Sequence, residues 1–349
     1  MQSITFAADF GSLLNQYKVL ELSEELLQEI EQGQGEVCIK GAPAEEAVLC
    51  TKDTTYSLRQ LDTREVQSMF TGYLELHEVL PRTGVLPALL GECPYEGEEA
   101  EEEKEMALET AETTKGRKYT WEALRNQVQA SDQQLLNALK RINAFEWNGH
   151  WRLLGRSFIT ELMDRIITAA HANEWPLSAI PVEACQQNLR MYPGQVVEHC
   201  LRIYSRSTES PTPDVVALDP TLLCAMRAED ILLEGPDKPW VLSDFMGKWK
   251  DRMQNDDITL SPSSEMLKGI ALVSTLGTER RLTYLPNTSL PPTAPARFAF
   301  LFNKQRKWTL DEVTPYIEDL VEPGMTAEKL LMKYARMSEQ NGQRFFTPR

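Results

Sequence analysis

The chain of 349 residues is 42% apolar and carries a net charge of −16, and its apolar content can form the cores of two or three domains. No apolar run approaches the roughly 18 residues of a membrane span, and the first residues lack a signal-peptide pattern. We therefore expect a soluble intracellular protein without a membrane partner. The six cysteines include no C-x-x-C pair, which favours reduced thiols and argues against a zinc site.

Residues 1–91 read as a β-rich domain with one helix. Four short apolar or alternating segments predict strands: "KVLELS", "GEVCIKG", "EEAVLCT" and "TTYSLRQL". The segment "CTKDTT" predicts a hairpin turn, and "EELLQEIEQGQG" predicts a helix that ends at glycine. So few strands do not close a barrel, so we expect a partial β-barrel that partner chains complete. Protection of the sheet edges within the chain is the alternative.

Residues 92–116 form the acidic segment "ECPYEGEEAEEEKEMALETAETTKG", with ten acids against two bases. Like charges at this density repel one another, which predicts a solvated, flexible linker between two domains. Residues 117–349 differ from it in charge, because 28 acids are balanced by 28 bases.

An apolar pattern recurs four times after this linker. In "KWTLDEVTPYI" a capping box of Thr309 and Glu312 predicts a helix start. Counted from the aromatic residue that opens the pattern, here Trp308, apolar residues follow two, five and nine positions later. These three residues lie along one helical face. The four copies are Tyr119-Trp121-Leu124-Val128, Trp175-Leu177-Ile180-Ala184, Trp240-Leu242-Phe245-Trp249 and Trp308-Leu310-Val313-Ile317.

Each copy is followed by a second amphipathic segment and then by a segment of hairpin character, as in "FEWNGHWRLL". Helix, turn, helix and hairpin make a winged helix, and a preceding helix is predicted for the last three copies. We therefore expect an α+β protein with a C-terminal tandem array of winged helices. Its expected parts are a partial helix-turn-helix with hairpin at 117–155 and winged helices at 156–218, 219–287 and 288–349. An all-α domain with chance periodicity is the alternative.

No pattern in the sequence predicts catalysis, a cofactor or a metal. The segment "GQGEVCIKG" lacks the spacing of a phosphate-binding loop, and Lys40 stands in a predicted strand. The four histidines share no helical face and no nucleophile motif. We therefore expect a protein that is not an enzyme.

The end of the chain is basic. From Lys329 to Arg349 five bases stand against Glu339 alone, namely Lys329, Lys333, Arg336, Arg344 and Arg349. On the predicted helix "TAEKLLMKYARM", Lys333 and Arg336 are three residues apart and project from one face, and the hairpin is expected to bring Arg349 near them. These five residues are the candidate binding residues, with a merely solvated basic surface as the alternative.

Several segments together resemble the Dcc family of sister-chromatid cohesion proteins. They are "AVLCTKDTTYSL", "CPYEG", "NGHWRLL", "EHCLRIY", "LKGIALV", "KWTLDEVTPYIEDL" and "LLMKYARMSEQNG", and their order spans nearly the whole chain. The resemblance implies a nuclear, non-catalytic subunit of the alternative replication factor C clamp loader, which acts on the sliding clamp at replication forks. It also implies an N-terminal region that joins two other clamp-loader subunits in a composite β-barrel.

For the C-terminal winged helices, the resemblance implies contact with DNA polymerase epsilon and with single- or double-stranded DNA, and it places the polymerase contact at the final winged helix. A winged-helix transcription regulator that binds DNA directly is the alternative, and it would carry base-reading side chains and form symmetric dimers. The zero net charge of residues 117–349 argues against a solitary high-affinity DNA binder. The partial copy at Tyr119 departs from the three winged helices of the family.

Overall fold

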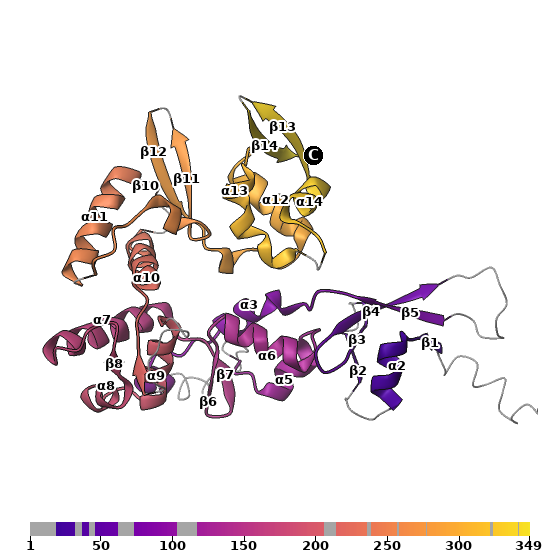
Figure 1. The fold of residues 1–349 in the computed structure, drawn as a ribbon, viewed down its shortest axis with the longest axis horizontal. Helices are drawn as coiled ribbons and strands as arrows, with labels where there is room; N and C mark the ends of the chain where they lie inside the picture. Colours follow the sequence, from indigo (N-terminus) through magenta and orange to yellow (C-terminus); the bar gives the residue numbers. More distant parts are fainter. Residues whose placement is uncertain are drawn as a thin grey trace, which may run out of the picture. The chain divides into compact units, whose positions relative to one another are not determined.

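A computed structural model shows a mixed α+β chain (Figure 1), as the sequence predicts. It describes residues 19–31, 37–41, 46–61, 73–102, 117–205, 214–235, 239–256, 258–276, 278–321, 324–340 and 342–349. The chain divides into two compact units. Unit 1 consists of residues 1–86 and 119–142, and unit 2 consists of residues 87–118 and 143–349.

Unit 1 is built on a five-stranded sheet in the order β1-β5-β4-β3-β2. Its strands are β1 (Val19–Glu21), β2 (Cys38–Lys40), β3 (Val48–Cys50), β4 (Thr55–Leu61) and β5 (Tyr73–Glu78). Strands β1 and β5 are parallel, and the other neighbours are antiparallel. The predicted turn at Lys52-Asp53 joins β3 to β4, and the predicted helix is α2 (Glu24–Glu31). Because β1 and β2 are the outer strands, the described residues form an open sheet and no closed barrel.

Helices α5 (Trp121–Gln127) and α6 (Asp132–Arg141) belong to unit 1 and not to the array. The Thr55 hydroxyl accepts a hydrogen bond from the Ser131 amide at 3.1 Å and donates one to Gln134 Oε1 at 2.6 Å. The Lys40 ammonium donates to the Ala130 carbonyl at 2.7 Å. The hairpin of β6 (Phe145–Trp147) and β7 (His150–Arg152) lies in unit 2. The expected module at 117–155 is therefore divided, because buried polar contacts attach its helices to the sheet.

The start of the expected acidic linker is folded and partly buried, although most of its glutamates are exposed. After η1 (Thr83–Val85) and α3 (Leu86–Gly91), Cys93, Tyr95 and Glu101 are all buried. The Glu101 carboxylate accepts hydrogen bonds from both terminal nitrogens of Arg152, each at 2.7 Å. This ion pair offsets the repulsion between like charges that the acidic composition predicts. Residues 103–116 of the expected linker lie outside the described residues.

Three helix-and-strand modules follow in unit 2. Module I has α7 (Arg156–Ala172), β8 (Ile180–Pro181), α8 (Val182–Asn188), α9 (Gly194–Ile203) and β9 (Val215–Val216). Module II has α10 (Pro220–Leu233), β10 (Trp240–Val241), α11 (Leu242–Asn255), η2 (Ser264–Leu267), β11 (Ala271–Leu276) and β12 (Glu279–Tyr284). Module III follows η3 (Asn287–Ser289) and has α12 (Ala294–Lys304), α13 (Leu310–Val313), η4 (Thr314–Tyr316), η5 (Glu318–Leu320), α14 (Ala327–Tyr334), β13 (Ala335–Gln340) and β14 (Gln343–Pro348).

In each module the residue two positions before the start of the second helix pairs with the last strand. The pairs are Ile180 with Val216, Trp240 with Leu282 and Trp308 with Phe346. In module I this position belongs to Ile180 and not to Trp175, so the predicted copy starts five residues too early. The 0-2-5-9 spacing continues from Ile180 through buried Val182, Cys185 and Leu189.

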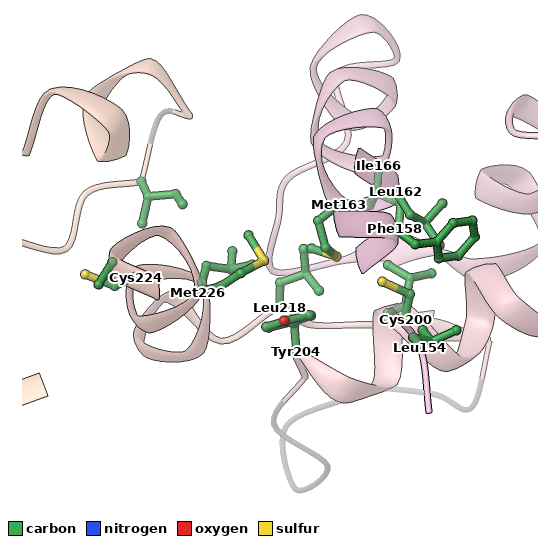
Figure 2. Close-up of a cluster of buried hydrophobic side chains, with 14 of the residues drawn as sticks. Leu154, Phe158, Leu162, Met163, Ile166, Cys200, Tyr204, Leu218, Cys224 and Met226 are labelled. Carbon is green, nitrogen blue, oxygen red and sulfur yellow. The ribbon is translucent and has the colours of Figure 1, made fainter. Parts of the chain in front are cut away.

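Modules I and II share one continuous apolar core, which reaches from Tyr95 to Leu282. Figure 2 shows its centre, where side chains of α7 such as Phe158 and Leu162 lie opposite Cys200 of α9. A second core cluster belongs mainly to module III and includes Trp308 and Phe346. Modules I and II therefore contribute side chains to the same core.

Candidate interaction surfaces

The structure offers no clear centre for metal chemistry. Within the described ranges, no group of three or more His, Cys, Asp or Glu side chains could hold a metal ion. No helix in the described part of the chain is long and apolar enough to cross a membrane.

The candidate basic residues of module III do not all lie where the sequence predicts. Helix α14 ends at Tyr334, so Lys329 and Lys333 are on the helix, whereas Arg336 is in β13 opposite Thr347. The expectation that Lys333 and Arg336 share a helical face is wrong. The backbone leaves the helix because β13 pairs with β14 from Ala335 onward. Sequence periodicity does not reveal this, because a helix and a strand both tolerate "YARM".

Two of the five bases are held by contacts within module III. Arg344 Nη1 lies 3.0 Å from Glu328 Oε1, so part of its charge is balanced. Arg349 Nη2 donates to the Met332 carbonyl at 2.8 Å, which brings Arg349 to the end of α14 as expected. Lys329, Lys333 and Arg336 are exposed, and no acidic group among the described residues lies within 4 Å of them. Exposed Lys333 and Arg336 therefore flank the junction of α14 and β13, whereas Lys329 lies in the first turn of α14.

Helix α9 of module I has the position that follows the turn, but the β6–β7 hairpin covers part of it. His199 Nε2 donates to the Asn143 carbonyl at 2.9 Å, and Gln195 Nε2 donates to the Glu146 carbonyl at 2.9 Å. The Phe145 ring lies 4.7 Å from the His199 ring. Burial lowers the pKa of His199, although the backbone hydrogen bond opposes this shift. One face of α9 is therefore committed to an internal contact.

Unit 1 exposes apolar side chains close to its sheet edge. Half of the eight large apolar side chains that are exposed in the described part of the chain belong to α2 or to β2 and its approach, namely Leu27, Ile30, Val37 and Ile39. Ile39 is 62% exposed and lies in β2, an outer strand of the sheet. Such a concentration of apolar surface beside unpaired backbone is typical of a protein interface.

Two buried ion networks hold unit 2 together. Arg227, 1% exposed, contacts Asp164 of α7 at 2.6 Å, Asp230 at 3.5 Å and Asp256 at 2.5 Å. It therefore ties α7 of module I to α10 and α11 of module II. A guanidinium buried this deeply needs its acidic partners, so the network acts on stability, although Asp164 is itself 45% exposed.

The second network lies beside an open pocket of about 320 Å³ whose lining includes Glu98, Lys118, Trp147 and Arg152. Arg152 and Lys118 both contact Glu101. Burial alone would raise the pKa of Glu101, but hydrogen bonds from these two bases outweigh it and hold the pKa below its usual range. Because Arg152 is engaged by Glu101 and by the Cys93 and Pro94 carbonyls, it is not available to a ligand.

Sequence reasoning found the basic end and the incomplete sheet but missed the exposed residues beside the sheet edge. The alternation in "EVCIK" is a signal for a strand, yet it does not say whether that strand is central or outer. The sequence pattern also gives no signal for Arg227, because the three acidic partners of Arg227 come from three separate segments of the chain.

Comparison with known proteins identifies the family of the chain. The family model described as "Sister chromatid cohesion protein Dcc1" matches residues 17–63 and 59–317. "Sister chromatid cohesion protein DCC1" of Xenopus laevis is 31% identical over 99% of this chain and 92% of the relative. The proteins of the same name from Mus musculus and Homo sapiens are each 30% identical over 97% of this chain, covering 88% and 90% of the relatives. The chain belongs to the Dcc1 family of sister chromatid cohesion proteins.

Proposed function

We propose that the chain is a non-catalytic adaptor subunit of the alternative replication factor C clamp loader in the nucleus, with a role in sister chromatid cohesion. In this proposal unit 1 joins two other clamp-loader subunits, and modules I to III are winged helices that link the complex to DNA polymerase epsilon and to DNA. The sliding clamp is reached indirectly, through the other subunits. Membership of the Dcc1 family supports the role in cohesion.

The observation that carries the proposal is the open sheet of unit 1. Its outer strand β2 carries Ile39 at 62% exposure, and Leu27 and Ile30 of α2 are also exposed. A strand from another chain would pair with the free backbone groups and cover these side chains. The sheet would then become part of a composite barrel.

The order of elements in modules I to III supports the winged-helix interpretation. In each module a helix precedes a short strand position, at least two further helical segments and one or two closing strands. The strand position pairs with the last strand, as Trp308 does with Phe346. In module II the third helical segment is only the short η2, so it has less surface for binding than α9 or α14.

The alternative of a transcription regulator is less well supported. Such a protein reads bases with the helix after the turn, and α9 has this position in module I. The contacts of His199 and Gln195 with the hairpin occupy one face of that helix. Residues 117–349 also have no net positive charge. An adaptor that binds protein first and DNA second fits these features better.

The first test is affinity purification of the full-length chain followed by identification of its two nearest partners. Two clamp-loader subunits are the expected result. Recovery of a second copy of the chain on DNA, without those subunits, would favour the transcription regulator instead.

The second test concerns the exposed bases near the junction of α14 and β13. Charge reversal of Lys333, Arg336 and Arg349 to glutamate is expected to weaken binding of polymerase epsilon at least about tenfold, while assembly of the clamp loader stays intact. Reversal of Arg165, Arg190 and Lys250 in modules I and II supplies a control with the same change in net charge. Unchanged polymerase binding by the first variant would remove the proposed contact.

DNA binding can be separated from polymerase binding by its salt dependence. Three neutralised phosphates predict a log–log slope of about −2.7 on duplex DNA. If DNA is a ligand of this surface, the slope should flatten in the same triple variant. A slope that is equal in both proteins would place DNA contacts elsewhere.

A further inference from the structure

Two free cysteines lie opposite each other on neighbouring strands of unit 1. Cys38 is in the outer strand β2, Cys50 is in β3, and the antiparallel register pairs them directly. Cys38 is partly exposed, whereas Cys50 is completely buried. The register therefore places one accessible thiol opposite one buried thiol.

The strand geometry permits a bond between the two sulfur atoms. Residues directly opposite in an antiparallel pair have Cα atoms about 4.5 or 5.5 Å apart, depending on the type of pair, and their side chains point to the same face. Disulfides occur at Cα separations of about 4.4–6.8 Å. Both kinds of pair are inside this range, so closing the bond needs side-chain rotation and no shift of a strand.

The surroundings of Cys50 agree with this placement. Burial raises the pKa of the Cys50 thiol, the Thr55 hydroxyl and Lys40 lower it, and the nearby Cys38 raises it again. The Sγ atom of Cys50 lies 3.7 Å from Thr55 Oγ1. Cys50 is therefore a slow nucleophile at neutral pH that becomes faster as the pH rises.

The other four cysteines are in a different situation. Cys93, Cys185, Cys200 and Cys224 are all buried in unit 2. Burial raises the pKa of Cys185 and Cys224 to about 11, and burial with the neighbouring Cys185 raises that of Cys200 to about 12. A small oxidant in solution thus meets Cys38 first.

We propose that Cys38 and Cys50 form a reversible disulfide that responds to the thiol–disulfide balance of the surroundings. The oxidant is a small-molecule disulfide such as oxidised glutathione. The Cys38 thiolate attacks one of its sulfurs, which forms a mixed disulfide and releases one glutathione. The Cys50 thiolate then attacks Cys38 Sγ and releases the second glutathione. Two protein thiols are oxidised, one glutathione disulfide is reduced, and the two thiol protons end on the two glutathiones.

This bond would tie the outer strand of the sheet covalently to its neighbour. Strand β2 has only three residues and pairs on one side only within the described residues. A cross-link is therefore expected to restrict fraying of β2 and to raise the apparent melting temperature of unit 1 by several degrees.

The test uses the full-length chain in buffers with increasing ratios of oxidised to reduced glutathione. Free thiols are then blocked by alkylation and the chain is cut with trypsin. Cleavage after Lys40 separates the two cysteines, so the disulfide is detected as a covalent link between peptides 19–40 and 41–52. The linked pair is expected to lose two hydrogens, to return to free thiols with reduced glutathione, and to form faster at higher pH.

Substitutions separate the proposed closure from simple glutathione addition. Cys50→Ala is expected to retain the glutathione adduct on Cys38 at a level about tenfold above the wild type, because the second attack is lost. Cys38→Ser should show neither adduct nor link, and Cys185→Ala, a matched loss of a buried thiol, should still form the link. A wild-type chain that keeps glutathione on Cys38, links other cysteines, or leaves Cys38 unmodified would overturn the proposal.

Discussion

Unit 1 and unit 2 differ in how completely they bury their apolar side chains. Modules I and II of unit 2 bury theirs in one core that runs from Tyr95 to Leu282. Unit 1 buries Val48, Leu49 and Cys50 of β3 but leaves Ile39 of the next strand 62% exposed. Modules I and II therefore have the features of a self-contained core, whereas unit 1 has a surface that is suited to another chain.

The largest expected effect is on the ion network that joins modules I and II. Arg227→Met leaves Asp164 and Asp256 without the buried guanidinium, so we expect a loss of about 3–5 kcal/mol in the free energy of unfolding of unit 2. Urea unfolding followed by tryptophan fluorescence measures it. Arg252→Met is the control, because Arg252 is 47% exposed and 4.0 Å from Asp164, and it should cost less than about 1 kcal/mol. Equal losses in the free energy of unfolding for Arg227→Met and Arg252→Met would contradict a stabilising role of the buried Arg227 network.

The second prediction concerns Glu101, the buried acid in the segment that the sequence predicts to be a linker. Glu101→Gln removes the charge that Arg152 and Lys118 share, and we expect a cost of about 1.5–3 kcal/mol at pH 7. The lowered pKa of Glu101 means that its stabilisation is present above the usual value of 4.5 and is lost as the pH falls through the folded-state pKa. The difference between wild type and variant should therefore shrink below about pH 4.5.

Titration of unfolding at several pH values checks this second prediction. Glu102→Gln is a matched control, because Glu102 is exposed in the same pocket and should change the free energy of unfolding very little. A difference between wild type and Glu101→Gln that stays constant down to pH 3 would mean that the ion pair is not responsible.

A smaller effect is expected where α6 attaches to the sheet of unit 1. Thr55→Val keeps the shape of the side chain but removes the hydroxyl that contacts Ser131 and Gln134. We expect a loss of about 0.5–1.5 kcal/mol, because two hydrogen bonds between Thr55 and α6 are lost while the Ser131 amide keeps its bond to Gln134 Oε1. Hydrogen exchange of the Ser131 and Gln134 amides measures local opening. Thr54→Val, whose hydroxyl contacts Asp53 at an exposed site, should leave these exchange rates unchanged.

The smallest effect on stability should accompany the largest effect on assembly. Ile39→Lys exchanges an exposed apolar side chain on β2 for a charge, so the free energy of unfolding of the isolated chain should change by less than about 0.5 kcal/mol. Binding of partner subunits should nevertheless fall strongly, since a charge would be buried in the joint sheet. Met191→Lys, at a side chain 72% exposed in module I, should leave assembly intact, and an equal loss in both variants would remove the difference between the units.

Much of the repeat architecture follows from local sequence. The capping box of Thr309 and Glu312 forms as predicted, and the hairpin at Asn148-Gly149 joins β6 to β7. Local rules also mislead where two structures suit the same residues. Helix α13 stops after four residues and continues as short 3₁₀ turns, because Pro315 cannot donate to a longer helix.

The candidate surface was predicted only in part for a similar reason. Exposed Lys329 and Lys333 lie on α14 as the periodicity predicts, but Arg336 lies in β13, where pairing with Thr347 replaces the helix. The start of module I shows the same competition. Trp175 and Ile180 both begin a plausible 0-2-5-9 series, and the pairing of Ile180 with Val216 selects the second.

By itself the sequence determined most of the helices and strands, though not β5 or α3, together with the spacing of core residues and the basic end, because capping and periodicity act over a few neighbouring residues. Only the tertiary structure decided which segments belong together. It placed α5 and α6 with the sheet through Thr55, buried Glu101 against Arg152, and left β2 as an outer strand. These outcomes depend on contacts between residues that are far apart in the chain, where burial and charge pairing outweigh local preference.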